Sequence, residues 1–199
     1  LLDCGRQMTS EEGGISALDH AINSLLILAG VLARTGDRLQ VIAFGEGVVR
    51  HMPAVRGRLA ASRVARFVAG LDPEYVEPNY RLACEYVLRT TRRSSLVLLL
   101  TDLIDDTHER TLTEWFARLR VRHSPMLVLL RDQRLFDAAE DEEADDYTLA
   151  AARDMVMTRS LAIVSLRRRG TPVVDVAPSS LTPPLVESYL RHRARQRQR

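Results

Sequence analysis

The chain has 199 residues, with 28 basic and 26 acidic side chains and a formal net charge of +2. Hydrophobic residues make up 46% of the chain, which excludes an intrinsically disordered protein. The balanced charge, with no long basic stripe, argues against a nucleic-acid-binding protein, and the two cysteines, Cys4 and Cys84, form neither a disulfide framework nor a metal-ligand spacing.

Helical and strand patterns alternate along the chain, which predicts βαβ units and a mainly parallel sheet. Leu1-Leu2-Asp3 has the pattern of the end of a buried strand, so we expect further sequence upstream of it. The expected strands end at residue 3 and span 39–44, 48–52, 95–100, 126–130 and 171–176. The expected helices span 15–35 (closed by Gly36), 59–71, 80–91, 107–121, 149–169 and 185 to the end.

These elements predict one three-layer α/β domain over residues 1–178, with a Rossmann-like sheet that is mainly parallel. Gly45 to Gly47 separates two strand patterns and predicts a hairpin, whose second strand is an antiparallel edge strand. Residues 179–199 are expected to form a C-terminal helix with a basic tail. The acidic run at 140–146 is typical of a solvated loop or a helix start. The most apolar stretch, 25–33, is shorter than the roughly 20 residues of a membrane span.

Two of the expected strands end in an aspartate. Asp3 ends the first strand, and Asp102 follows the strand at 95–100. In open parallel sheets, binding sites form beyond the carboxyl ends of the strands, where the strand order reverses. We therefore expect both carboxylates at such an edge, where a carboxylate is hydrated, caps a helix or holds a cation.

These segments resemble the von Willebrand factor A fold, in which the first strand ends in Asp-x-Ser-x-Ser, a later loop supplies a threonine and the fourth strand ends in Thr-Asp. In that fold these residues form a metal ion-dependent adhesion site. A closer resemblance is to the domain-of-unknown-function 58 family, a branch of the same fold. The segments that carry it are Asp3 to Met8, Leu18-Asp19-His20-Ala21, Gly36-Asp37-Arg38 with Ala43-Phe44, Arg93 to Asp102, Arg169-Gly170 with Val174-Asp175-Val176, and Leu181-Thr182 with Tyr189-Leu190.

The resemblance implies a protein-interaction module and brings no defined catalytic activity, so we expect no enzyme. Members of that family usually carry transmembrane segments upstream, with this domain on the cytoplasmic side of the membrane. They look like partners of MoxR-type AAA+ ATPases that assist the assembly or maturation of other protein complexes. The resemblance therefore implies a MoxR-type ATPase or its client as the partner, and no nucleic acid.

The sequence departs from the adhesion-site pattern. Gly5 and Gln7 stand where that pattern has its two serines, and the threonine position falls near 77–79, where we choose Asn79. The loss of two hydroxyls weakens a site for Mg²⁺, which prefers six oxygens. We therefore expect no tightly bound metal. The candidate ligands for Mg²⁺ or Mn²⁺ are Asp3, Gln7, Asn79 and Asp102.

Arg6 adds a cation to the same loop, and one hypothesis is that it pairs with Asp3 or Asp102 and takes the place of the metal. The loops at 3–8, 77–79 and 102–106 form the expected partner-binding face. The residues expected to contact the partner are Gly5, Arg6, Met8, Glu77, Asp105 and Asp106.

Two other functions remain open. A metal-dependent nuclease or phosphatase would hold one or two ions on Asp3, Asp102, Asp105 and Asp106. Against it, the sequence shows no obvious general base and no phosphate-gripping loop. A structural domain that oligomerises through the edge strand at 48–52 is the other possibility.

Overall fold

The computed structural model describes residues 1–102, 106–141 and 143–198. Its strands are β1 (Leu2–Asp3), β2 (Glu11–Glu12), β3 (Ile15–Ser16), β4 (Arg38–Phe44), β5 (Val48–Arg56), β6 (Leu96–Thr101), β7 (Ser124–Leu130) and β8 (Val173–Val176). Its helices are η1 (Arg6–Thr9), α1 (Ala17–Thr35), α2 (Leu59–Val68), α3 (Tyr80–Thr90), α4 (Asp106–Arg120), α5 (Gln133–Glu140), α6 (Asp146–Arg168), η2 (Pro178–Ser180) and α7 (Thr182–Arg197), where η denotes a 3₁₀ helix.

Six strands form one sheet in the order β5-β4-β1-β6-β7-β8. All neighbours are parallel except β4 and β5, which form an antiparallel hairpin at the sheet edge. This confirms the predicted α/β fold class, with its mainly parallel sheet and its single antiparallel edge strand. The edge strand β5 carries Pro53 and two charged side chains, Arg50 and Arg56, features that discourage pairing with another sheet.

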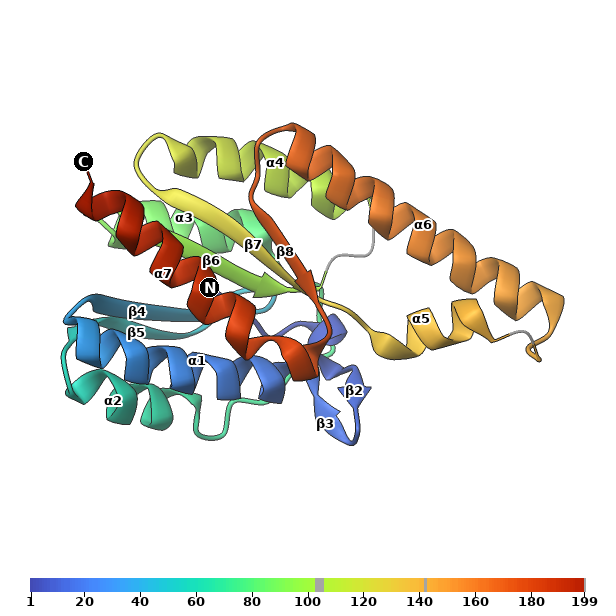
Figure 1. Ribbon diagram of the computed structural model, residues 1–199, viewed down its shortest axis with the longest axis horizontal. Helices are drawn as coiled ribbons and strands as arrows, with labels where there is room; N and C mark the ends of the chain where they lie inside the picture. Colours follow the sequence, from blue (N-terminus) through green and yellow to red (C-terminus); the bar gives the residue numbers. More distant parts are fainter. Residues whose placement is uncertain (103–105, 142, 199) are drawn as a thin grey trace.

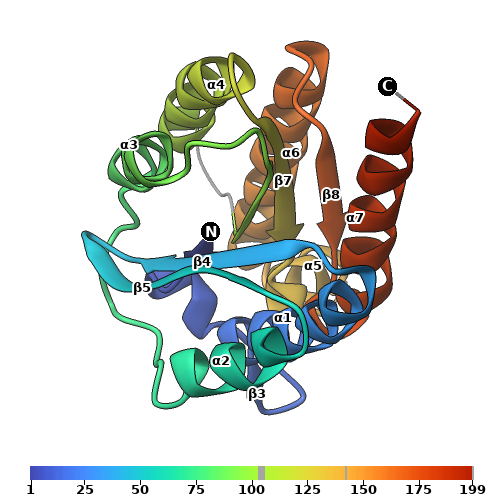
Figure 2. The same cartoon turned by 90° about the vertical axis from the view of Figure 1, so that its left-hand side faces the viewer.

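The helices cover both faces of the sheet and give a three-layer domain (Figures 1 and 2). One face is covered by α1, α2 and α7, and the other by α3, α4 and α6. The first helix layer packs on the sheet through Leu18, Leu25 and Leu28, while the second packs through Phe116 and Leu166. The apolar stripe of each helix therefore meets the nearly continuous apolar runs of the buried strands, as expected for a parallel sheet.

Local sequence signals fix the ends of the first long helix. The Ser16 hydroxyl accepts the backbone N–H of Asp19 at 3.0 Å, which makes Ser16 the N-cap of α1. Gly36 has φ = 75° and donates its N–H to the carbonyl of Leu32, which ends the helix as predicted. By length and composition, α1 is also the one helix among the described residues that is apolar enough to cross a membrane, a test that buried core helices pass as well.

The described acidic residues of the run at 140–146 are exposed, as expected, but the sequence did not predict a helix in the segment between β7 and α6. This segment contains α5, which packs against α6 to form an arm extending beyond the carboxyl ends of the strands (Figure 1). The expectation of a helix start is confirmed at Asp145, whose carboxylate accepts the backbone N–H groups of Tyr147 and Thr148 and so caps α6.

The C-terminal helix α7 is packed into the domain. Leu185 and Tyr189 are buried against α1, and the Tyr189 hydroxyl donates to Asp37 at 2.5 Å. Arg193 pairs with the same carboxylate at 2.8 Å and donates to the carbonyl of Thr35. These contacts fix α7 against the C-terminal end of α1.

Candidate functional site

The two predicted aspartates lie at the carboxyl ends of adjacent strands. Leu2 of β1 pairs with Leu100 of β6, so Asp3 and Asp102 lie next to each other where the connections diverge toward opposite sheet edges. This is the point where the strand order reverses, at which a binding site was predicted from the sequence. Asp3 is 0% exposed and Asp102 is 4% exposed. Buried carboxylates need hydrogen bonds or a paired cation, so their partners determine what the site can do.

Asp3 is held by neutral donors. Its Oδ1 accepts the backbone N–H of Gly5 at 2.7 Å, and its Oδ2 accepts the Thr101 hydroxyl at 2.5 Å and the Tyr80 hydroxyl at 3.4 Å. Tyr80 also lies 2.8 Å from the Thr101 oxygen, so these three side chains form one buried cluster. Burial raises the pKa of Asp3 to about 6, although the hydrogen bonds from Thr101 and Gly5 oppose that rise.

Asp102 has a cationic partner. The Arg159 guanidinium, from the middle of α6, lies with Nη1 3.0 Å from Asp102 Oδ1 and Nη2 2.9 Å from Asp175 Oδ1. Arg131, which follows β7, pairs with the other oxygen of Asp175 at 3.1 Å. Arg159 is 2% exposed, so the network of two arginines and two aspartates is buried at Asp102 and Arg159 and reaches the surface at Arg131, and it joins the ends of β6, β7 and β8 to α6.

The hypothesis that Arg6 replaces a metal is wrong. Arg6 pairs instead with Glu77 at the surface, and the other Glu77 oxygen lies 3.7 Å from Nε2 of His108. Arg159 occupies the position proposed for Arg6. The sequence carried one signal for it, because Arg159 stands on the α6 stripe otherwise formed by buried residues such as Ala152, Ile163 and Leu166.

Two of the residues expected to contact a partner are buried. Met8 is 0% exposed and packs in the apolar core under α1, so it lies outside any exposed contact surface. Gly5 is also buried, and a Cβ there would come within 2.9 Å of Pro78 and of the Val76 carbonyl. The glycine is therefore required by close packing of the loops. Asp105 lies outside the described residues, and Asp106 begins α4.

The side chains at the strand ends do not fit a divalent metal. Both oxygens of Asp3 accept hydrogen bonds, Asp102 is paired with a guanidinium, and the Asn79 oxygen accepts the backbone N–H of Leu82 as the N-cap of α3. Gln7 lies apart from this cluster, in a surface hollow. Within residues 1–102, 106–141 and 143–198, no group of three or more His, Cys, Asp or Glu side chains is placed to hold a metal.

We therefore expect Mg²⁺ or Mn²⁺ to leave the melting temperature unchanged relative to EDTA. A metal at about 100 times its dissociation constant would stabilise the fold by about 2.7 kcal/mol, or roughly 5–11 °C for a domain of this size. Differential scanning calorimetry in each ion and in EDTA measures the difference. A stabilisation of several degrees that disappears in Asp3→Ala would show that the site binds metal.

A polar hollow of about 400 Å³ opens between the loop that follows β1, the loop before α3 and the residues that follow β7. It is lined by Arg6, Gln7, Thr9, Ser10, Glu11, Tyr75, Asp132 and Arg134. Tyr75 is 87% exposed. Tyr75 was not among the residues expected at the site, although an aromatic residue in the polar loop between Pro73 and Pro78 was a signal for it.

Cys4, which lies beside Asp3, is suited to packing. The thiol is buried, and burial, with the nearby Asp3 carboxylate, raises its pKa to about 12. A thiol with this pKa stays protonated at neutral pH, and the thiolate is the nucleophilic form. Cys4 is therefore part of the core at the end of β1.

A family model described as "Protein of unknown function DUF58" matches residues 11–142. The match runs from β2 to the turn between α5 and α6 and includes Glu77, Tyr80 and Asp102. Asp3 and Arg159, which complete the buried clusters, lie outside the matched stretch. A search of curated proteins finds none that matches the chain.

Proposed function

The chain belongs to the family of proteins of unknown function DUF58, and from that premise we propose that it is a protein-interaction module, not an enzyme. The face at the carboxyl ends of the strands would bind the partner. The observation that carries the proposal is the contrast within this face between buried charges and exposed ones. Asp3 and Asp102 are satisfied internally, whereas Arg6, Arg134 and Tyr75 surround an open polar hollow.

The residue types that line this hollow are suited to binding the surface of another protein. Tyrosine and arginine are the residue types that most often dominate binding energy at protein interfaces, because each combines a large contact area with a polar group. Arg134 lies 3.5 Å from Glu11, and Arg6 pairs with Glu77, so both guanidinium groups are oriented before a partner arrives. Preorganised side chains lose less conformational entropy on binding.

We propose as the partner a MoxR-type AAA+ ATPase or its client, the partner class implied by the family resemblance. The domain would then assist the assembly or maturation of other protein complexes. We propose further that the domain lies on the cytoplasmic side of a membrane, as the family resemblance implies. The internal pairing of Asp102 supports a contact that does not need a bridging metal.

The test is binding of this chain to a purified MoxR-type ATPase from the same organism, measured by isothermal titration calorimetry with EDTA present. We expect Tyr75→Ala and Arg6→Ala each to weaken binding at least tenfold, since a central interface residue contributes more than about 1.4 kcal/mol. The matched control is Arg63→Ala, because Arg63 is exposed on α2, away from the hollow. Equal affinity of all three variants and the wild type would reject this face as the binding surface.

The hydrolase alternative would require Asp3 and Asp102 to bind ions. The Arg159 guanidinium beside Asp102 opposes this, because a fixed cation repels a second one at the same carboxylate. Phosphatase and nuclease assays with Mn²⁺ separate the two functions. Metal-dependent turnover that is lost in Asp3→Ala would favour the enzyme over the interaction module.

A further inference from the structure

The charged side chains are segregated between the two ends of the sheet. We define the amino-end face as the chain connections at the amino ends of the parallel strands, residues 34–38, 56–58, 89–95, 118–124 and 167–172, with the end of α7 at 191–198. Among their described side chains, Asp37 is the one acidic group, and Arg193 already neutralises it at 2.8 Å. The arginines of this face are Arg34, Arg38, Arg56, Arg58, Arg89, Arg92, Arg93, Arg118, Arg120, Arg122, Arg167, Arg168, Arg169, Arg191, Arg193, Arg195 and Arg197.

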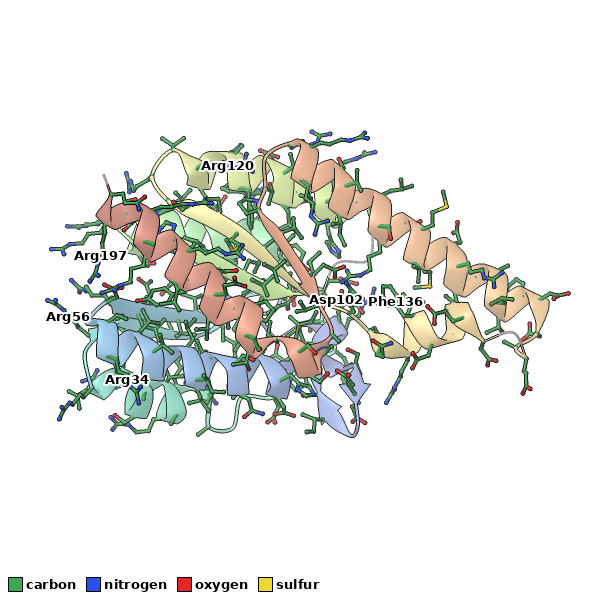
Figure 3. The ribbon with its side chains drawn as sticks, viewed as in Figure 1. Arg34, Arg56, Asp102, Arg120, Phe136 and Arg197 are labelled. Atoms are coloured by element: carbon green, nitrogen blue, oxygen red, sulfur yellow. The ribbon has the colours of Figure 1, made fainter. Side chains whose placement is uncertain are left out.

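These arginines gather at one end of the molecule. In Figure 3, Arg34, Arg56 and Arg197 lie at the left-hand end, with Arg120 at its upper side, while Asp102 lies toward the opposite end of the strands. Figure 2 looks onto the left-hand end. All of the arginines of the face except Arg193 are exposed. The small net charge of the whole chain therefore conceals a strongly basic face.

The opposite end, beyond the carboxyl ends of the strands, is mainly acidic. Its loops and α5 contain three arginines, Arg6, Arg131 and Arg134, and two more lie nearby, Arg81 in the first turn of α3 and Arg153, which donates to the Ala139 carbonyl of α5. Its exposed or half-buried acidic residues are Glu11, Glu12, Glu46, Asp72, Glu74, Glu77, Asp132, Asp137, Glu140, Asp141, Glu143, Asp145 and Asp146. An anionic surface would attract one end of the protein and repel the other, which defines an orientation.

We infer that the amino-end face docks on the surface of an anionic lipid membrane. The positive charge is spread over six separate segments, and a broad basic surface complements a layer of phosphate headgroups. Guanidinium groups also form forked hydrogen bonds with phosphate oxygens. Val121 is 89% exposed between Arg120 and Arg122, so an apolar side chain accompanies the charges at the point where it could enter the headgroup layer.

A nucleic acid fits this face less well. Proteins that bind single strands stack bases on exposed aromatic rings beside the basic groups. The two strongly exposed aromatic side chains in the described part of the chain, Tyr75 and Tyr147, lie in the loop before α3 and at the start of α6, both away from the amino-end face. Docked on a membrane in this way, the domain would present the hollow around Tyr75 away from the lipid and toward other proteins.

The test is co-sedimentation of the 199-residue chain with vesicles of phosphatidylcholine containing phosphatidylglycerol, with pure phosphatidylcholine vesicles as the reference. We expect binding to the anionic vesicles alone, and weaker binding as salt shortens the screening length from about 10 Å at 0.1 M to about 3 Å at 1 M. Each arginine at a membrane surface contributes a factor of about five to the partition coefficient. The triple variant Arg92→Gln/Arg93→Gln/Arg122→Gln should therefore bind roughly 100-fold more weakly.

The matched control is Arg63→Gln/Arg66→Gln/Arg110→Gln, which removes the same charge from exposed positions on α2 and α4 outside the face. It should bind nearly as well as the wild type. Equal losses in the two triple variants would overturn the proposal, as would no binding to anionic vesicles at low salt. Tighter binding to duplex DNA or RNA, lost in the first triple variant, would assign the face to nucleic acid instead. None of these measurements involves the partner protein, so a failure here leaves the proposed interaction face untouched.

Discussion

Replacement of Arg159 by methionine is expected to lower the free energy of unfolding by about 3–5 kcal/mol at neutral pH. Methionine is apolar and flexible enough to occupy much of the space of the arginine stem. The change removes the cation between Asp102 and Asp175: Asp102 loses its ion pair with Arg159, and Asp175 keeps only its ion pair with Arg131. A buried charge that loses its partner costs far more than a surface ion pair contributes.

Urea unfolding followed by circular dichroism measures this loss, and for a domain of this size it corresponds to a fall of roughly 6–20 °C in melting temperature. The control is Arg168→Met, because Arg168 is exposed on the same helix. That variant should stay within about 0.5 kcal/mol of the wild type. A loss below about 1 kcal/mol in Arg159→Met would show that the network does not hold α6 to the strand ends.

The second large effect is a dependence of stability on pH that comes from Asp3. Burial raises the pKa of this carboxyl from 3.8 to about 6 in the folded protein. A difference of this size corresponds to about 3 kcal/mol. As the pH falls, the folded protein binds the proton before the unfolded chain does. The contribution of Asp3 to stability is therefore fully present below about pH 4 and is lost as the pH rises through about 6.

Histidines act in the opposite direction over the same range. Burial lowers the pKa of His51, His123 and His192, so their protonation at low pH favours the unfolded chain. The informative quantity is therefore the difference in unfolding free energy between Asp3→Asn and the wild type, in which the histidine contributions cancel. Relative to the wild type, Asp3→Asn should gain stability between about pH 4 and about pH 8. We expect this gain in unfolding free energy to be about 3 kcal/mol.

Asparagine keeps an acceptor for the N–H of Gly5, and its amide group replaces the oxygen that faces Thr101. The hydroxyl of Thr101 is able to accept from that amide and donate to the carbonyl of Asp102, which lies 3.1 Å away. The matched control is Asp154→Asn, since Asp154 is an exposed residue of α6. For Asp154→Asn, the unfolding free energy relative to the wild type should not change with pH. The same absence of pH dependence for Asp3→Asn would contradict the burial effect.

Much of the fold was predictable because each element has a local signal. The apolar runs at 39–44 and 95–100, the helical spacing after Ile15 and the turn at Gly45 to Gly47 each depend on a few neighbouring residues. One helix, α5, was missed altogether, and the other differences lie at the ends of elements, where tertiary contacts determine the last residue of a helix or strand. The helix expected at 59–71 ends at Val68. Arg50 donates to the carbonyls of Phe67, Ala69 and Gly70, at and just beyond the end of this helix, where carbonyl groups lack a partner within the helix.

The site was less predictable because its contacts join distant parts of the chain. Asp3 and Asp102 follow from strand ends, so their positions were predicted correctly. Tyr80 and Arg159 come from helices on the same side of the sheet, 77 residues after Asp3 and 57 residues after Asp102. Arg6 was the nearest cation in sequence, but its loop directs it to Glu77. The basic face was not predicted because its arginines lie in six short segments, and no single segment is unusually basic.

The position of β1 has a consequence for how the chain folds during synthesis. β1 comes first in the chain, yet it lies inside the sheet, where Leu2 pairs with Ala43 and with Leu100. Ribosomes add about 5–20 residues per second, so Leu100 is made roughly 5–20 s after Leu2. The β4–β5 hairpin forms from neighbouring residues in the meantime, whereas β1 can pair with β6 only after β6 has been synthesised. Completion of the sheet is thus set by a long-range pairing, which is slow compared with local structure.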